Sequence, residues 1–205
     1  PQDLSVAIVS DLDGELAGGS ASTGGIYTTE VTTLSVGLHK FTATVTDPAG
    51  DSESAEISMI INGPPESPTV DIIPADPSTA EELSVVVDED ALSDPNGDTV
   101  DLEYNWYRDG ALRQEGGLYL AAAETVKDEE WQVRVTPSDG RLEGEYGEAT
   151  VTIANTPPEV ESVSIDPTEG VTSASILACS AVYSDLDEEQ TPDSEELSLA
   201  YAWTL

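Results

Sequence analysis

Apolar and polar residues alternate in short runs along most of the chain. The clearest run covers residues 100–106, where every second side chain is apolar, and the pattern returns at 131–135 and 151–153. A period of two residues is typical of a β-strand with one buried face. Turn sequences rich in Asp, Asn, Gly and Pro separate the runs, for example at 94–97 and 138–140. The pattern predicts an all-β protein built from many short strands.

One joint sequence occurs twice. INGPPESPTVDIIP begins at Ile61, and IANTPPEVESVSIDP begins at Ile153, so that Pro64 and Pro157 lie 93 residues apart. Other similar stretches are separated by 90 to 97 residues, which is too long a period for a solenoid and predicts tandem domains. Because a Pro-Pro pair cannot continue a strand ladder and is stiff, each joint is expected to separate two domains.

Four stretches carry a family resemblance. LEYNWYRDG, WQVRVTPSDG and TIANTPP resemble the tandem immunoglobulin-like repeats of very large bacterial surface proteins. GLHKFTATVTDPAG looks like the polycystic-kidney-disease (PKD) and cadherin-like relatives of those repeats. The resemblance implies tandem immunoglobulin-like β-sandwich domains in an extended array, located outside the cell or on its surface.

The resemblance also implies three domains along the chain. Residues 1–63 would form a partial domain that starts at about strand C, 64–156 a complete domain, and 157–205 a partial domain with about strands A to C. In this alignment Ile8 takes the place of Trp106, and SDLDG at 10–14 becomes the turn after strand C. We therefore expect the 205 residues to be part of a longer chain.

The net charge narrows the possible partners. Asp and Glu number 42 against 6 Lys and Arg, giving a formal charge of −36. Nucleic acid is excluded as a natural partner because it is itself a polyanion. Two compatible interpretations remain, a solvated acidic surface and a set of carboxylates that hold divalent cations. No apolar run approaches the length of a membrane span, so no membrane insertion is expected in this segment.

Calcium is the one cofactor that the sequence suggests. Asp94, Asn96 and Asp98 stand at alternate positions of one turn, where their oxygens would converge on a hard cation. The other candidate ligands are Asp88, Asp90, Asp185 and Asp187. Asp and Asn also form turns by bonding their own backbone, which explains the same residues without a metal.

The residues for catalysis are sparse. His39 is the only histidine and Cys179 the only cysteine, so neither a zinc set nor a base beside a nucleophile is indicated, and we expect no enzyme. In an immunoglobulin-like sandwich, a residue of strand B faces one of strand F across the strand-C Trp. Cys179 aligns with Val86, 93 residues earlier, and Val133 is the facing position. The alignment therefore predicts that Trp106 packs between Val86 and Val133. Cys179 is expected to be structural, either free or bonded to a cysteine beyond Leu205.

The leading functional hypothesis is an extracellular structural or adhesive segment of a large surface protein, forming a stiff stalk, fibre or filament that calcium would rigidify. The alternative is a non-catalytic spacer or carbohydrate-binding module of a secreted surface enzyme, which would need an exposed aromatic platform. The expected partners are further repeats of the same chain or neighbouring copies, and surface glycans or proteins. Head-to-tail copies would complete a sandwich between them, although both halves would then supply strand C.

Overall fold

The computed structural model describes residues 3–187, which group into two compact units. The first unit comprises the residues up to Ser67 with Asp90–Leu102 and Pro137–Glu145, and the second comprises Pro68–Glu89, Glu103–Thr136 and the described residues from Tyr146 onward. Within the described residues, regular structure consists of β-strands and two 3₁₀ turns of three residues each, so the all-β prediction is confirmed. Both units contain residues from the predicted middle domain, and the predicted domain boundaries stay a prediction.

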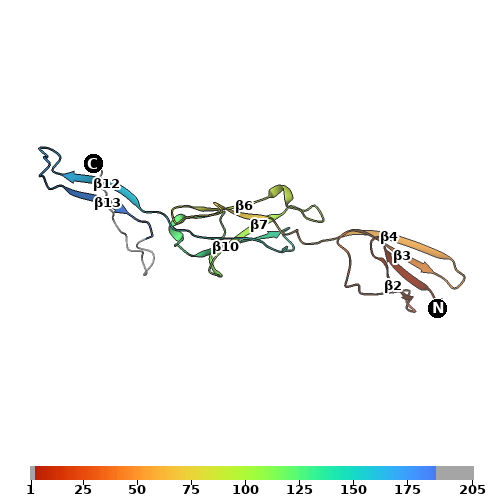
Figure 1. The fold of residues 1–205 in the computed structure, drawn as a ribbon. Coiled ribbons are helices and arrows are strands. Elements are labelled where there is room, and N and C mark those ends of the chain that lie inside the picture. Colours follow the sequence, from red (N-terminus) through yellow and green to blue (C-terminus); the bar gives the residue numbers. More distant parts are fainter. Residues whose placement is uncertain (1–2, 188–205) are drawn as a thin grey trace. The chain divides into compact units, whose positions relative to one another are not determined.

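A four-stranded antiparallel sheet forms most of the first unit (Figure 1). Its strands are β1 (Ser5–Ser10), β2 (Gly14–Ser20), β3 (Gly37–Thr46) and β4 (Ser52–Ile61), in the order β2-β1-β3-β4. The register pairs Phe41 with Ile57 and His39 with Met59, so that these side chains share one face. Ile57 is nevertheless 63% exposed and Met59 52% exposed, so no second sheet in the described residues covers this part of the face.

Two facing sheets form a sandwich, most of whose residues belong to the second unit. One contains β5 (Val70–Ile73), β6 (Leu83–Val87) and β9 (Tyr119–Leu120), and the other contains β7 (Asp101–Arg108), β8 (Ala111–Glu115), β10 (Glu130–Ser138) and β11 (Gly147–Thr152). The orders β5-β6-β9 and β11-β10-β7-β8 correspond to strands A-B-E and G-F-C-C′. This is the strand arrangement of an immunoglobulin-like sandwich in which the fourth strand has joined the C-F-G sheet. It confirms the predicted immunoglobulin-like fold, and the extended tandem array stays a prediction. The same C′-C-F-G order describes β2-β1-β3-β4 in the first unit.

The interior of the sandwich is apolar and supplied by both sheets. Trp106 and Val133 are fully buried, as predicted, and Leu83 and Val85 reach the interior from the opposite sheet. The prediction for Val86 is wrong, because this side chain is 44% exposed. Since side chains alternate along a strand, the burial of its neighbour Val85 turns Val86 outward.

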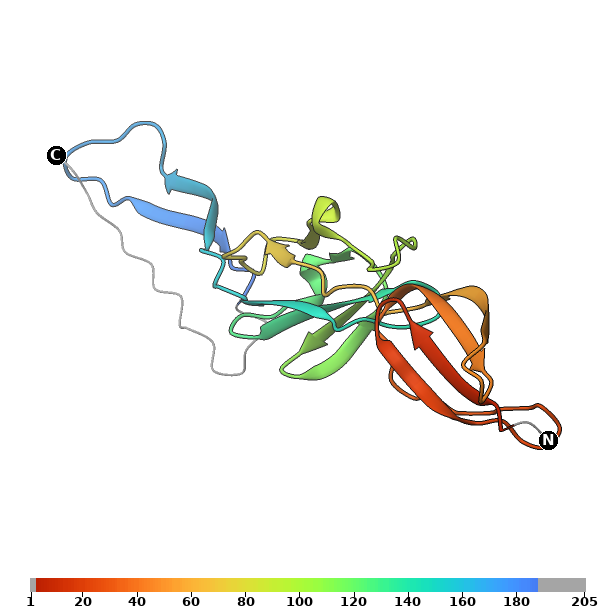
Figure 2. The same ribbon diagram turned by 90° about the vertical axis from the view of Figure 1, so that its right-hand side faces the viewer.

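A one-residue difference in a loop explains the error at Val86. The last hairpin consists of β12 (Glu159–Asp166) and β13 (Ala178–Ser184), which lie side by side (Figure 2). It pairs Ile165 with Cys179, whereas the β5–β6 hairpin pairs Ile72 with Val85. The cysteine therefore corresponds to Val85, 94 residues earlier, because the later loop is one residue longer. Cys179 is free and half-buried, and the strand predicted to end at Trp203 lies outside the described residues.

Candidate functional site

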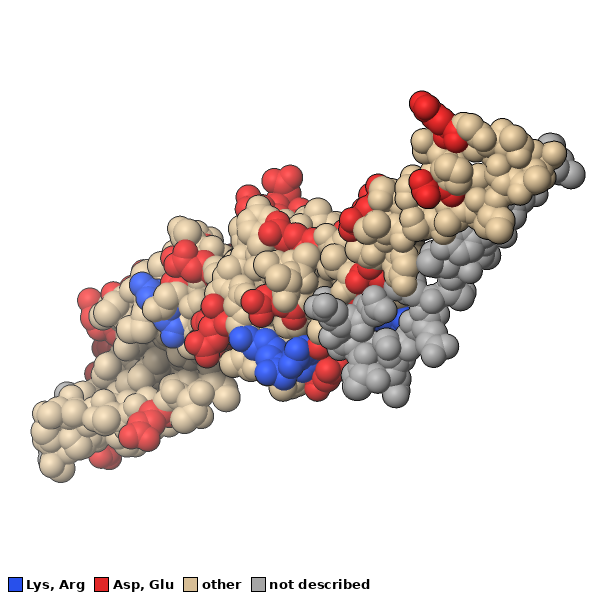
Figure 3. Space-filling model, turned by 90° about the vertical axis from the view of Figure 1, so that its left-hand side faces the viewer, with Lys and Arg blue, Asp and Glu red and all other residues tan. Residues whose placement is uncertain are grey.

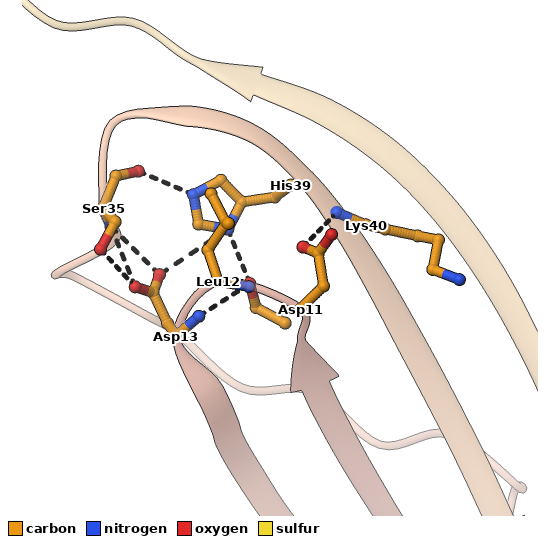
Figure 4. Close-up of polar contacts among 7 residues, drawn as sticks. Asp11, Leu12, Asp13, Ser35, His39 and Lys40 are labelled. Atoms are coloured by element: carbon orange, nitrogen blue, oxygen red, sulfur yellow. Dashed lines mark hydrogen bonds and ion pairs between the residues drawn. The ribbon is translucent and has the colours of Figure 1, made fainter.

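The first candidate site is a polar cluster around His39, at the end of the first sheet where β1 turns into β2. Ser10 is the last residue of β1, Asp13 lies in the following turn, Ser35 precedes β3, and His39 is on β3 (Figure 4). His39 is fully buried and its ring stacks on Phe41, with 5.3 Å between the ring centroids. The turn predicted at residues 10–14 after strand C is present.

Both nitrogens of the His39 ring are hydrogen-bonded. Nε2 lies 2.7 Å from the carbonyl oxygen of Ser35, which can only accept, so Nε2 carries the proton. Nδ1 is hydrogen-bonded to the hydroxyl of Ser10, also at 2.7 Å. The Ser10 oxygen in turn accepts the N–H groups of Leu12 (3.2 Å) and Asp13 (3.3 Å). The ring thus links Ser35 to Ser10 and fixes the turn.

This Ser-His-Asp group lacks the geometry of a catalytic triad. In a triad the serine and the carboxylate contact opposite nitrogens of the ring. Here Nδ1 faces both Ser10 and Asp13, whose Oδ2 is 3.7 Å away, and Ser10 is buried. The Asp13 carboxylate instead accepts the hydroxyl and the N–H of Ser35, and these bonds lower the pKa of Asp13 below its usual range. The cluster is suited to joining three segments of backbone.

The second candidate site is the turn at residues 93–98, where calcium was predicted. Asp94 Oδ1 accepts the N–H groups of Asn96 (2.8 Å) and Asp98 (3.2 Å), which is the turn-forming role expected without a metal. The Asn96 side chain contacts the chain before the first Pro-Pro pair. The Asp98 carboxylate lies 3.8 Å from the guanidinium of Arg141.

The other predicted calcium ligands lie in separate places. Asp88 follows β6, where its N–H donates to the carbonyl oxygen of Thr69, and Asp90 is an exposed residue of the 3₁₀ turn Glu89–Ala91. Asp185 Oδ1 accepts the N–H of Asp187 at 2.8 Å. Asp187 itself is only 5% exposed.

Asp187 uses both carboxylate oxygens inside the protein. Oδ1 accepts the hydroxyl of Thr79 at 2.5 Å, and Oδ2 accepts the N–H of Thr156 at 2.7 Å. The hydroxyls of Thr79 and Thr156 are also bonded to each other, at 2.7 Å. A buried carboxylate that is hydrogen-bonded in this way closes the loop between β5 and β6 onto the second Pro-Pro joint.

The predicted calcium ligands therefore do not form one set. Among residues 3–187, no group of three His, Cys, Asp or Glu side chains is arranged to hold a metal. Five of the oxygens predicted to bind calcium already accept hydrogen bonds, namely Asp94 Oδ1, Asn96 Oδ1, Asp185 Oδ1 and both oxygens of Asp187. At the first turn, however, Asp94 Oδ2 and Asn62 Oδ1 are buried without a hydrogen-bond partner. Calcium binding stays a prediction.

Several residues of these sites were not predicted. Asn62 donates from Nδ2 to Asp139 Oδ2 at 2.6 Å, and the Thr79 and Thr156 contacts with Asp187 were also missed. The sequence does hold a signal for part of this arrangement. Ser-Asp-Pro-Asn at 93–96 and Ser-Asp-Leu-Asp at 184–187 are similar, and each follows a Pro-Pro pair by about one hairpin.

Comparison with known proteins yields fold similarity only. No known family model and no curated protein matches the chain. Murine CEACAM1b is 12% identical, with a TM-score of 0.30 over 75% of this chain and 86% of its own. The fibronectin(III)-like modules of Clostridium thermocellum CbhA are 14% identical, with a TM-score of 0.30 over 75% of this chain and 79% of theirs. At this level neither similarity adds to what the strand order shows. No helix in the described part of the chain is long and apolar enough to cross a membrane.

Proposed function

We propose that this segment is a non-catalytic structural module of an extracellular surface protein, serving as a stiff spacer within a stalk or fibre. The observation that supports this function best is where the aromatic side chains lie. Trp106 is fully buried and donates from Nε1 to the carbonyl oxygen of Gly117 at 3.3 Å. Trp131, 2% exposed, donates to Glu129 Oε2 at 3.0 Å. Both tryptophans therefore serve the sandwich interior.

The same observation weighs against a carbohydrate-binding module. Such a module stacks sugars on exposed aromatic faces. Tyr146 is an exposed aromatic residue of the sandwich, yet the guanidinium of Arg134 lies 4.8 Å from its ring centroid and 4.8 Å from that of Tyr107. The cation covers one face of each ring and competes with a sugar for it. Tyr119, 59% exposed, has no such cover and is the residue to test.

The distribution of charge is consistent with a solvated surface module. On the face shown in Figure 3, acidic side chains are scattered over the described part, and few Lys or Arg side chains lie among them. A high net charge keeps copies apart and in solution. This supports an extracellular, surface-attached location as part of the proposal.

Small-angle X-ray scattering on the whole 205-residue chain tests the spacer function. A stiff array with one complete sandwich and two partial neighbours should reach a maximum dimension on the order of 100 Å, estimated from strand rise and length. A compact particle would overturn the proposal. Binding of a panel of surface polysaccharides that is lost in Tyr119→Ala would favour the carbohydrate-binding alternative instead.

A further inference from the structure

Two of the three Ser-Asp-x-Asn/Asp stretches in the chain have the same internal geometry, whereas in the third, Ser10–Asp13, Asp11 Oδ1 accepts the N–H of Lys40 instead. The two are Ser93–Asn96 and Ser184–Asp187. In each, Oδ1 of the first aspartate accepts the N–H of the residue two positions later, at 2.8 Å in both turns. This bond fixes the turn from which the last side chain, Asn96 or Asp187, extends.

That last side chain binds an equivalent backbone atom at both Pro-Pro joints. Asn96 Oδ1 accepts the N–H of Gly63 at 2.8 Å, and Asp187 Oδ2 accepts the N–H of Thr156 at 2.7 Å. Gly63 and Thr156 each directly precede a Pro-Pro pair and lie 93 residues apart. Because proline has no N–H, each of these groups is the last backbone donor before the joint.

We infer that the turns Ser93–Asn96 and Ser184–Asp187 are linker clamps, which hold the residue before each Pro-Pro pair through that last donor. A residue before proline is already restricted to extended conformations. One further hydrogen bond from a fixed turn then leaves the linker little freedom. This role accounts for residues that were predicted to bind calcium, and it does not depend on what the module supports or binds.

The partners explain why the clamp residue is an amide in one turn and an acid in the other. Asn96 faces one donor and one acceptor, because its Nδ2 also donates to the carbonyl oxygen of Ile61 at 3.1 Å. Asp187 faces two donors, the Thr156 N–H and the Thr79 hydroxyl. An aspartate at 96 would set a carboxylate oxygen against the Ile61 carbonyl. An asparagine at 187 keeps its acceptor for Thr156 and can donate to the Thr79 hydroxyl.

Amide hydrogen exchange measured by NMR on the full chain tests the clamp. In the wild type we expect the Gly63 and Thr156 amides to be protected although they lie outside the strands. Asn96→Asp and Asn96→Ala should each speed Gly63 exchange by at least about fivefold, the loss of one net hydrogen bond. Asp187→Asn should leave Thr156 nearly unchanged, and Asp187→Ala should speed its exchange.

Asp98→Asn is the matched control, because Asp98 lies in the same turn but its side chain contacts Arg141 rather than the linker. It should leave Gly63 exchange at the wild-type rate. The clamp is overturned if the wild-type Gly63 and Thr156 amides exchange as fast as unprotected ones, a result that does not depend on any variant folding. It is also overturned if Asn96→Ala and Asp98→Asn give the same Gly63 rate.

Discussion

The two Pro-Pro joints share a sequence but are supported in different ways. At the first, Gly63 and Pro65 are buried, and Gly144 approaches so closely that an added Cβ would lie 2.2 Å from the Pro65 carbonyl oxygen. At the second, Pro157 and Pro158 are exposed. The first joint thus depends on close backbone packing. The second depends on a buried carboxylate.

This difference shows what a repeated motif conserves within one chain. Both joints keep the turn and the bond to the last backbone donor. The surrounding support varies, with the Gly63 backbone packed near Val36 and Pro95 at the first joint and Thr79 bonded to Asp187 at the second. Substitutions that add a side chain should therefore destabilise the first joint, and substitutions that remove a hydrogen bond should destabilise the second.

Trp106→Ala should cause the largest loss of stability, because it destabilises the sandwich itself. The losses at the two joints are compared with it. Truncating a fully buried Trp should lower the free energy of unfolding by about 3–5 kcal/mol. Urea denaturation followed by tryptophan fluorescence, which Trp131 still reports, measures the loss. A change below that of an exposed substitution such as Thr152→Val would mean that the interior does not hold the fold together.

Gly144→Ala should be the most damaging small change at the first joint. The new Cβ would meet backbone, the Pro65 carbonyl, which cannot move aside as a flexible side chain would. We expect a loss of about 1–3 kcal/mol in unfolding free energy, typical of overpacking. Gly24→Ala is the control, since a Cβ there finds only the Ser22 hydroxyl oxygen at 3.8 Å. Equal stability of the two variants would remove the steric half of the comparison.

Thr79→Val is the corresponding test at the second joint. Valine keeps the shape of the side chain but removes the hydroxyl that donates to Asp187, leaving one oxygen of a buried carboxylate without that partner. The expected cost is about 1–3 kcal/mol by thermal or urea unfolding. Thr152→Val, the same change at an exposed position of β11, should stay within about 0.5 kcal/mol. A neutral Thr79→Val would show that the carboxylate does not support this joint.

Much of the fold could be predicted from the sequence because its signals are local. The alternation of apolar and polar residues predicted that Trp106 and Val133 are buried, and the turn residues predicted the SDLDG turn, which lies between β1 and β2. Val86 was misplaced because a single inserted loop residue reverses the faces of a strand, and no local pattern records it. The joints were found, but the bonds of Asn96 and Asp187 join residues more than 30 positions apart. Acidic turns look alike whether they bind a cation, their own backbone or a distant linker.

The first joint should also weaken in acid. The hydrogen bond from Asn62 Nδ2, followed by the N–H groups of Leu142 and Arg141, lowers the pKa of Asp139 below its usual range. A carboxyl whose folded pKa is depressed stabilises the fold above the unfolded pKa of about 3.9, and this contribution is lost as pH falls through the folded pKa. Titration of the Asp139 carboxyl carbon by NMR should show the low pKa, and Asn62→Ala should raise it. An unchanged midpoint in that variant would show that Asn62 is not the cause.

Calcium should have the smallest effect, confined to the first joint. There Asp94 Oδ2 and Asn62 Oδ1 are buried without a hydrogen-bond partner, whereas both oxygens of Asp187 are occupied at the second. We expect a chelator to lower the Tm of the wild type slightly and calcium to restore it, since a ligand that binds only the folded state stabilises it. Asp94→Asn should abolish the response, and Asp187→Asn should keep it.

Because the chain carries a net charge of −36, sodium at equal ionic strength is the essential control. Recovery of Tm by sodium as well as by calcium would mean that salt only screens repulsion between carboxylates. In that case the clamps would hold both joints by hydrogen bonds alone.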